Sequence, residues 1–83
     1  MWPYLVCYEL MSGIRSISLA AALASLRATP LLPNCWLMLS NGSASELRRL
    51  LAPLFDPEDR LLVVLLDDDV ASANLDLPPG MLR

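Results

Sequence analysis

Apolar runs separated by turn residues predict the strands of a sheet. The clearest are residues 4–10, 35–39 and 60–66, which are rich in apolar, β-branched and aromatic side chains. The apolar side chains occupy both alternating faces, and Glu9 ends one face of the first run. A strand that is apolar on both faces is expected to be buried on both faces. The pattern therefore predicts a sheet that needs cover on each side.

Leucines at helical spacing predict a first helix over residues 17–28. Leu19, Leu23 and Leu26 fall at i, i+4 and i+7, which places them on one stripe of an amphipathic helix. Ser16 precedes the helix as a suitable N-cap. The surrounding alanines favour helix and keep it thin, so that it can lie close to a sheet.

A second helix is predicted after the turn residues at 40–42. Ser43 and Glu46 have the spacing of a capping box, in which each side chain satisfies the other residue's backbone donor. Pro53 should end or bend this helix within its last turn. The apolar stripe of the helix consists of Leu47, Leu50, Leu51 and Leu54.

The connecting segments carry turn and breaker residues. Residues 11–16 form a turn in which Gly13 is free to adopt a positive φ. Residues 29–34 contain two prolines, which lack ladder donors, so a short edge strand or irregular segment turning at Pro33–Asn34 is expected. Residues 70–83 show no clear period and are expected to be a strap or partly disordered.

The order of elements, β-α-β-β-α-β, is that of the α+β ferredoxin-like fold. It predicts a four-stranded antiparallel sheet in the order fourth, first, third, second, with both helices on one face. We expect one domain over residues 1–69 and a C-terminal tail or strap over residues 70–83.

The composition favours assembly. The chain has 83 residues, and 55% of them are hydrophobic, although a domain of this size buries only about 60–65% of its unfolded surface alone. The fourth strand carries six consecutive apolar residues at a sheet edge without proline or inward charge, a pattern that favours pairing with another chain. A homodimer, formed sheet to sheet or edge to edge, is predicted. Its predicted interface comprises Leu5, Cys7, Glu9, Leu61, Val63 and Leu65.

The charges narrow the chemistry. Six arginines, no lysine and nine acidic residues give a net charge of −3, which disfavours strong nucleic-acid binding without excluding it. The absence of histidine rules out histidine-based catalysis and histidine metal sites. Cys7 and Cys35 have no metal-ligand spacing, and their places in predicted strands favour buried, reduced thiols over a disulfide.

No signal peptide or membrane span is visible in the sequence. The first residues lack a basic segment, and the most apolar window, residues 17–39, contains Arg27, two prolines and Asn34. A cytoplasmic protein without membrane contact is the expectation.

Two segments and one tryptophan resemble a known family. The segments are YLVCYEL at residues 4–10 and ELRRLLAPLFDPEDRLLVVLL at residues 46–66, and Trp36 lies in the third strand. They resemble the small ferredoxin-like CRISPR-associated spacer-acquisition subunit of antiviral defence, an endoribonuclease-like family, and more closely its stand-alone relatives. The resemblance covers roughly residues 4–66, and the tail matches nothing in it.

The resemblance implies a homodimer that braces a DNA-integrating complex. It also implies Mg²⁺-dependent phosphodiester cleavage by an aspartate that closes the first strand near its symmetry mate. Here Glu9 stands at that position. A glutamate is an oxygen ligand suited to Mg²⁺, but its additional methylene would displace the metal from a catalytic geometry, which puts cleavage in doubt.

Each candidate residue has two interpretations. Paired Glu9 side chains can hold Mg²⁺ across a dimer as metal ligands and catalytic groups, or Glu9 can form an ion pair with Arg60. Arg48 and Arg49 can contact phosphate, or they can form a solvated helix face. Trp36 can stack on a base or belong to the core. The acidic run at residues 67–69 is expected to stop the fourth strand and solubilise its edge rather than to bind metal.

Three functions are consistent with the sequence. The first is a homodimeric structural or interaction scaffold that contacts proteins or nucleic acid, within a larger complex. The second is an Mg²⁺-dependent nuclease that uses paired Glu9 residues. The third is a small adaptor or inhibitor that docks its apolar edge and tail on a larger protein. Fold alone does not grant an activity.

Overall fold

The computed structural model describes residues 1–12, 16–67 and 69–74. The predicted glycine turn at Gly13 lies outside these residues, as does the tail beyond residue 74. Four strands, two α-helices and one 3₁₀ helix are assigned: β1 (Trp2–Glu9), α1 (Ser16–Ser25), β2 (Thr29–Leu32), β3 (Cys35–Ser40), α2 (Ala44–Leu51), η2 (Ala52–Leu54) and β4 (Arg60–Leu65).

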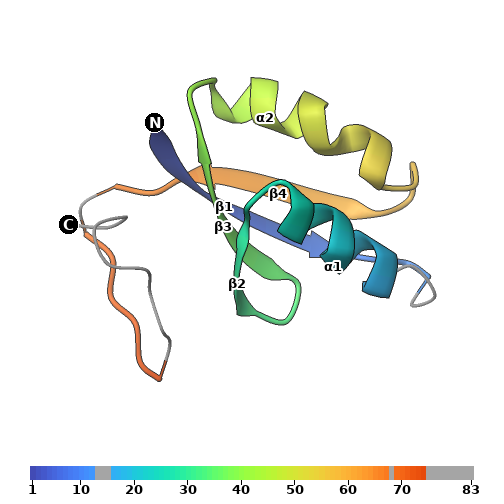
Figure 1. The fold of residues 1–83 in the computed structure, drawn as a ribbon, viewed down its shortest axis with the longest axis horizontal. Helices are drawn as coiled ribbons and strands as arrows, with labels where there is room; N and C mark the ends of the chain where they lie inside the picture. The colour runs from blue at the N-terminus through green and yellow to red at the C-terminus, as the bar shows by residue number, and fades with distance from the viewer. Residues whose placement is uncertain (13–15, 68, 75–83) are drawn as a thin grey trace.

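The strands form one antiparallel sheet in the order β2-β3-β1-β4 (Figure 1). This confirms both the α+β ferredoxin-like fold and the predicted strand order. β1 is central and pairs on one side with β3, where Tyr4 lies opposite Met38, and on the other with β4, where Tyr4 lies opposite Leu65. These two registers determine which face of the sheet each side chain of β1, β3 and β4 occupies.

Both helices pack on the same face of the sheet. One core cluster joins alternate residues of β1 and β3 to the buried leucines of the two helices. Complete burial of a leucine contributes about 1.5–3 kcal/mol, so these helix contacts supply much of the stability of the fold. The buried members of the cluster are Tyr4, Val6, Leu19, Leu23, Ala28, Trp36, Met38, Leu47 and Leu51.

α1 is shorter than predicted because Arg27 adopts a left-handed conformation with a φ of 64°. The Ala28 N–H donates to the Leu23 carbonyl at 3.1 Å and the Arg27 N–H to the Ala24 carbonyl at 3.0 Å, the two bonds of a Schellman motif. The predicted stripe therefore loses its third member: Leu26 lies beyond the helix and is 41% exposed.

α2 begins at the predicted capping box. The Glu46 N–H donates to Ser43 Oγ at 3.1 Å, and the Ser43 N–H donates to Glu46 Oε1 at 3.1 Å. The backbone hydrogen bond from Ser43, together with the Ser43 side chain, holds the pKa of Glu46 below its usual 4.5. The predicted stripe is right for Leu47 and Leu51, which are buried, and wrong for Leu50, which is 63% exposed.

The remaining connections follow the prolines and asparagines. Pro53 lies in η2, where α2 gives way to a tighter turn. β2 is a short edge strand, as expected from Pro30, and the chain reverses at Pro33–Asn34 with Asn34 at a φ of 62°. After β4, residues 69–74 continue as an irregular segment that leaves the sheet (Figure 1).

Replacing Arg27 by glycine should stabilise the fold. A left-handed conformation costs free energy in any residue with a Cβ, and glycine removes that cost while the cap is retained. The Arg27→Gly chain should gain about 0.5–1 kcal/mol and melt roughly 2–8 °C higher in a thermal scan. The matched control, Ala24→Gly in the helical region of α1, should lose about 1 kcal/mol. A lower melting temperature for Arg27→Gly would contradict the assigned helix end.

The capping box should make stability sensitive to acid. Because the folded state lowers the pKa of Glu46, its contribution is complete above the pKa of the unfolded chain and is lost as pH falls through the lower pKa of the folded chain. Glu46→Gln keeps a capping acceptor but cannot titrate. At one protein concentration, the melting temperature of the parent should therefore fall more steeply between about pH 6 and about pH 3 than that of Glu46→Gln. Parallel curves would show that the box makes no ionic contribution.

Candidate interaction surface

The sheet face opposite the helices, here called the open face, is apolar. Alternation along the registered strands places on it the side chains of Leu5, Cys7, Cys35, Leu37, Leu39, Leu62 and Val64. Leu37, between its register partners Leu5 and Thr29, is fully buried, whereas Leu62 and Val64 of β4 are 58% and 39% exposed. The open face is therefore most exposed along β4.

Within the described residues, the outer edge of β4 presents backbone groups that no strand pairs with. The Leu66 N–H donates to the Pro3 carbonyl at 3.0 Å, so even-numbered residues of this segment direct their backbone groups toward β1. Successive residues alternate, and therefore Leu61, Val63 and Leu65 direct their N–H and C=O groups away from the sheet. No other strand of the described chain pairs with this edge. Such an edge is a template for another strand.

The two edges of the sheet differ. β2 has four residues and includes Pro30, so its pairing capacity is low. β4 has six residues, without proline, and only its first side chain is charged. Leu65, on the helix-bearing side of β4, is 51% exposed. The sheet therefore has one edge that is protected against strand pairing, β2, and one edge, β4, that lacks this protection.

The structure divides the six residues of the predicted interface between two faces. Leu5, Cys7 and Glu9 point to the open face. The side chains of Leu61 and Val63 point to the helix-bearing face and pack against the core. The backbone N–H and C=O groups point away from the sheet in the three β4 residues of this set, Leu61, Val63 and Leu65. The pattern of side chains does not reveal this shared property.

Glu9 ends β1 directly opposite Arg60, the first residue of β4. The Arg60 Nε lies 3.6 Å from Glu9 Oε1, and the two side chains are 80% and 63% exposed. The structure thus contains the ion pair that was the alternative to metal binding. At such exposure a pair contributes about 0–1 kcal/mol to stability.

The acidic run after β4 lies far from Glu9. Antiparallel pairing places Asp67 near the Pro3 end of β1, whereas Glu9 is at the opposite end. Asp68 lies outside the described residues. Within the described ranges, no three carboxylate, thiol or imidazole groups come together as metal ligands.

Arg48 and Arg49 are exposed in the last turn of α2. Acidic residues accompany both: Arg48 lines a hollow with Asp56 and Asp59, and the charge of Arg49 helps to lower the pKa of Glu46. Local carboxylates therefore offset part of their positive potential.

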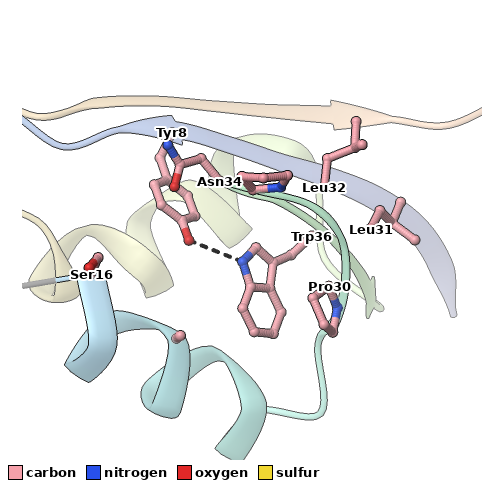
Figure 2. A pocket seen from close by; sticks show the side chains of 9 residues that line it. Tyr8, Ser16, Pro30, Leu31, Leu32, Asn34 and Trp36 are labelled. Carbon is pink, nitrogen blue, oxygen red and sulfur yellow. Dashed lines mark hydrogen bonds between the residues drawn. The ribbon is translucent and has the colours of Figure 1, made fainter. Parts of the chain in front are cut away.

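Trp36 belongs to the core, which was the structural interpretation of this residue, and it is 7% exposed. Its Nε1–H donates to the Tyr8 hydroxyl at 3.0 Å (Figure 2). The two side chains line a hollow that is also lined by Ser16, Pro30 and Leu32 (Figure 2). With 7% of its surface exposed and its indole N–H bonded to Tyr8, Trp36 offers little ring surface for stacking on a base.

The sheet brings the two cysteines together. Cys7 and Cys35 are register partners on β1 and β3, and their Sγ atoms are 3.6 Å apart. Both are free and half-buried. Burial, and secondarily the contact with Cys7, raises the pKa of the Cys35 thiol to about 11. The predicted strand order made β1 and β3 neighbours, but the pairing of these two residues comes from the register that the structure shows.

Neither described α-helix has the length and continuous apolar sequence that crossing a bilayer requires.

Comparison with known proteins adds no assignment: no protein-family model matches the chain, and neither does any curated protein or solved structure.

Proposed function

We propose that this protein is a homodimeric scaffold whose two copies pair through β4. The observation that carries the proposal is the outer edge of β4, which combines apolar side chains with outward, unpaired backbone groups at Leu61, Val63 and Leu65. A second copy supplies an identical edge, and two identical edges related by a twofold axis pair antiparallel. The product is one continuous eight-stranded sheet.

The outward groups select the register. In an antiparallel pair, hydrogen-bonded residues exchange both backbone bonds, so outward residues must face outward residues. Placing Val63 opposite Val63 of the second copy puts Leu61 opposite Leu65 in both directions. This register uses all three outward residues of each copy.

The side chains agree with that register. On the open face, Leu62 meets Val64 of the second copy, and both are exposed in the single chain. On the helix-bearing face, the half-exposed Leu65 meets Leu61. At each end, Arg60 approaches the acidic segment that begins at Asp67 of the other copy. Apolar contacts and opposite charges are therefore complementary in one arrangement.

This dimer would place both pairs of helices on one face. α2 packs beside β4, so the two copies of Arg48 and Arg49 lie on the same side of the joined sheet. We propose that this face contacts a larger protein complex, with nucleic acid as a weaker, salt-sensitive ligand. The role fits the brace function implied by the resemblance to the spacer-acquisition subunit, and a cytoplasmic location is proposed with it.

The nuclease and adaptor alternatives have less support. Glu9 is engaged with Arg60, so Mg²⁺ coordination would have to break an ion pair as well as recruit a second carboxylate from another copy. An adaptor would use the same β4 edge for a foreign strand instead of a second copy. The oligomeric state distinguishes that alternative from the scaffold.

Leu65→Lys should weaken the dimer, whereas Leu32→Lys should not. Both leucines are 51% exposed, but they lie on opposite edge strands, so the two variants differ in place rather than in chemistry. Two Leu65 contacts are lost per dimer, about 2 kcal/mol, which raises the dimer Kd roughly 30-fold. Light scattering after gel filtration and sedimentation equilibrium measure this change. A monomeric parent, or equal effects of the two variants, would overturn the β4 interface.

Cleavage assays should separate the scaffold from the nuclease. The scaffold predicts no Mg²⁺-supported cleavage of single- or double-stranded RNA or DNA above a protein-free control, and the same result for Glu9→Gln. Weak binding at low salt should decrease when both Arg48→Gln and Arg49→Gln are present, with the dimer intact. Cleavage by the parent that disappears in dimeric Glu9→Gln would instead establish the nuclease.

A further inference from the structure

We infer that Cys7 and Cys35 form a cross-strand dithiol site that reacts with small disulfides of the glutathione type and closes into an intrachain disulfide. This inference is independent of the proposed dimer. Its basis is the direct pairing of the two residues on neighbouring strands and the 3.6 Å separation of their Sγ atoms.

The backbone geometry allows the bond. The Tyr8 N–H donates to the Asn34 carbonyl at 3.1 Å, so even-numbered residues of β1 direct their backbone groups toward β3. Cys7 and Cys35 consequently occupy a non-hydrogen-bonded pair, in which Cα atoms are about 4.5 Å apart. That separation lies within the range of about 4.4–6.8 Å that disulfides span. A small rotation of the side chains, without movement of the strands, brings the sulfur atoms together.

Both thiols are half-buried, and Cys7 borders a hollow in the surface. Cys7 lines a hollow at the end of the sheet together with Glu9, Arg60 and Leu62, and both thiols lie on the face that the helices leave uncovered. Burial, and secondarily the contact with Cys7, raises the pKa of the Cys35 thiol to about 11, so this thiol is protonated and a poor nucleophile near neutral pH. The structure therefore assigns the first attack to Cys7 and the second to Cys35.

The reaction proceeds by two exchanges. The Cys7 thiolate attacks one sulfur of oxidised glutathione, forms a mixed disulfide and releases the first glutathione thiolate, which takes up a proton. Cys35 then loses its proton and attacks the Cys7 sulfur, which forms the intrachain bond and releases the second glutathione. Two protein thiols are oxidised and one molecule of glutathione disulfide is reduced to two thiols, so electrons and protons balance.

The bond would join the central strand to β3 beside the exposed end of β4. It closes a loop that includes α1 and β2, and closing such a loop restricts the unfolded chain. Under reducing conditions the state would be transient, as is usual for intracellular disulfides. The dithiol is thus a modification site on the surface of the sheet, rather than a buried pair of inert thiols.

The test exposes the fully reduced, folded chain to oxidised glutathione, quenches with acid, alkylates the remaining thiols and measures the intact mass. The expected product is a single chain that has lost two hydrogen atoms and has no disulfide to another chain. In a non-reducing digest, the peptides that contain Cys7 and Cys35 should be linked. Its melting temperature should rise on the order of 5–15 °C and return to the starting value after reduction. The ratio of intrachain to mixed disulfide should fall about 10-fold or more in urea, because only the fold holds the sulfurs together.

Single variants test the assigned order. Cys35→Ser should stop at a stable mixed disulfide, with one glutathione attached to Cys7. Cys7→Ser should acquire glutathione at Cys35 at about one tenth or less of the rate at which Cys35→Ser acquires it at Cys7. The reason is that burial keeps the Cys35 thiol protonated, and a protonated thiol is a poor nucleophile. Equal rates in the two variants would overturn the order of attack. In the parent, persistent alkylation of both cysteines after oxidation, or linkage only between chains, would overturn the site, and that measurement does not require either variant to fold.

Discussion

The structure depends on β1, which pairs with β3 through its even-numbered residues and with β4 through its odd-numbered residues. This double pairing fixes every side chain of the sheet to one face. It directs Tyr4 and Val6 into the core below the helices and sends Cys7 to the open face. A shift of one residue in either register would exchange these two sets.

The same pairing makes the sheet asymmetric. One face has two helices, and the other has apolar side chains that are most exposed on β4. One edge is shortened and carries Pro30, whereas the other has six residues with outward backbone groups. Natural sheets commonly blunt their edges. The unblunted β4 edge is therefore the feature of this fold on which the proposed dimer rests.

Charged side chains give weaker support for a binding site than the sheet edge does. Glu9 faces Arg60 across the ladder, and the arginines of α2 have carboxylates in their vicinity. Exposed pairs of this kind are weak, but they reduce the local potential that a phosphate or a metal ion would meet. The more distinctive chemistry is the pair of thiols on the open face, whose proximity follows from strand register rather than from charge.

The fold could be predicted from the sequence, because the apolar strand runs, the helical spacing of leucines and the capping box at Ser43 are local patterns that agree with one topology. It also anticipated the Glu9–Arg60 pair, since antiparallel strands place the end of one beside the start of the next. It did not determine the end of α1, because the left-handed conformation of Arg27 is imposed by the path into β2 and not by any preference of arginine. Nor did it show that Leu50 is exposed: the stripe of α2 is wider in sequence than the part that the sheet covers. The outward backbone groups of β4 and the meeting of Cys7 with Cys35 became visible only in the folded chain, because both depend on pairing between distant segments.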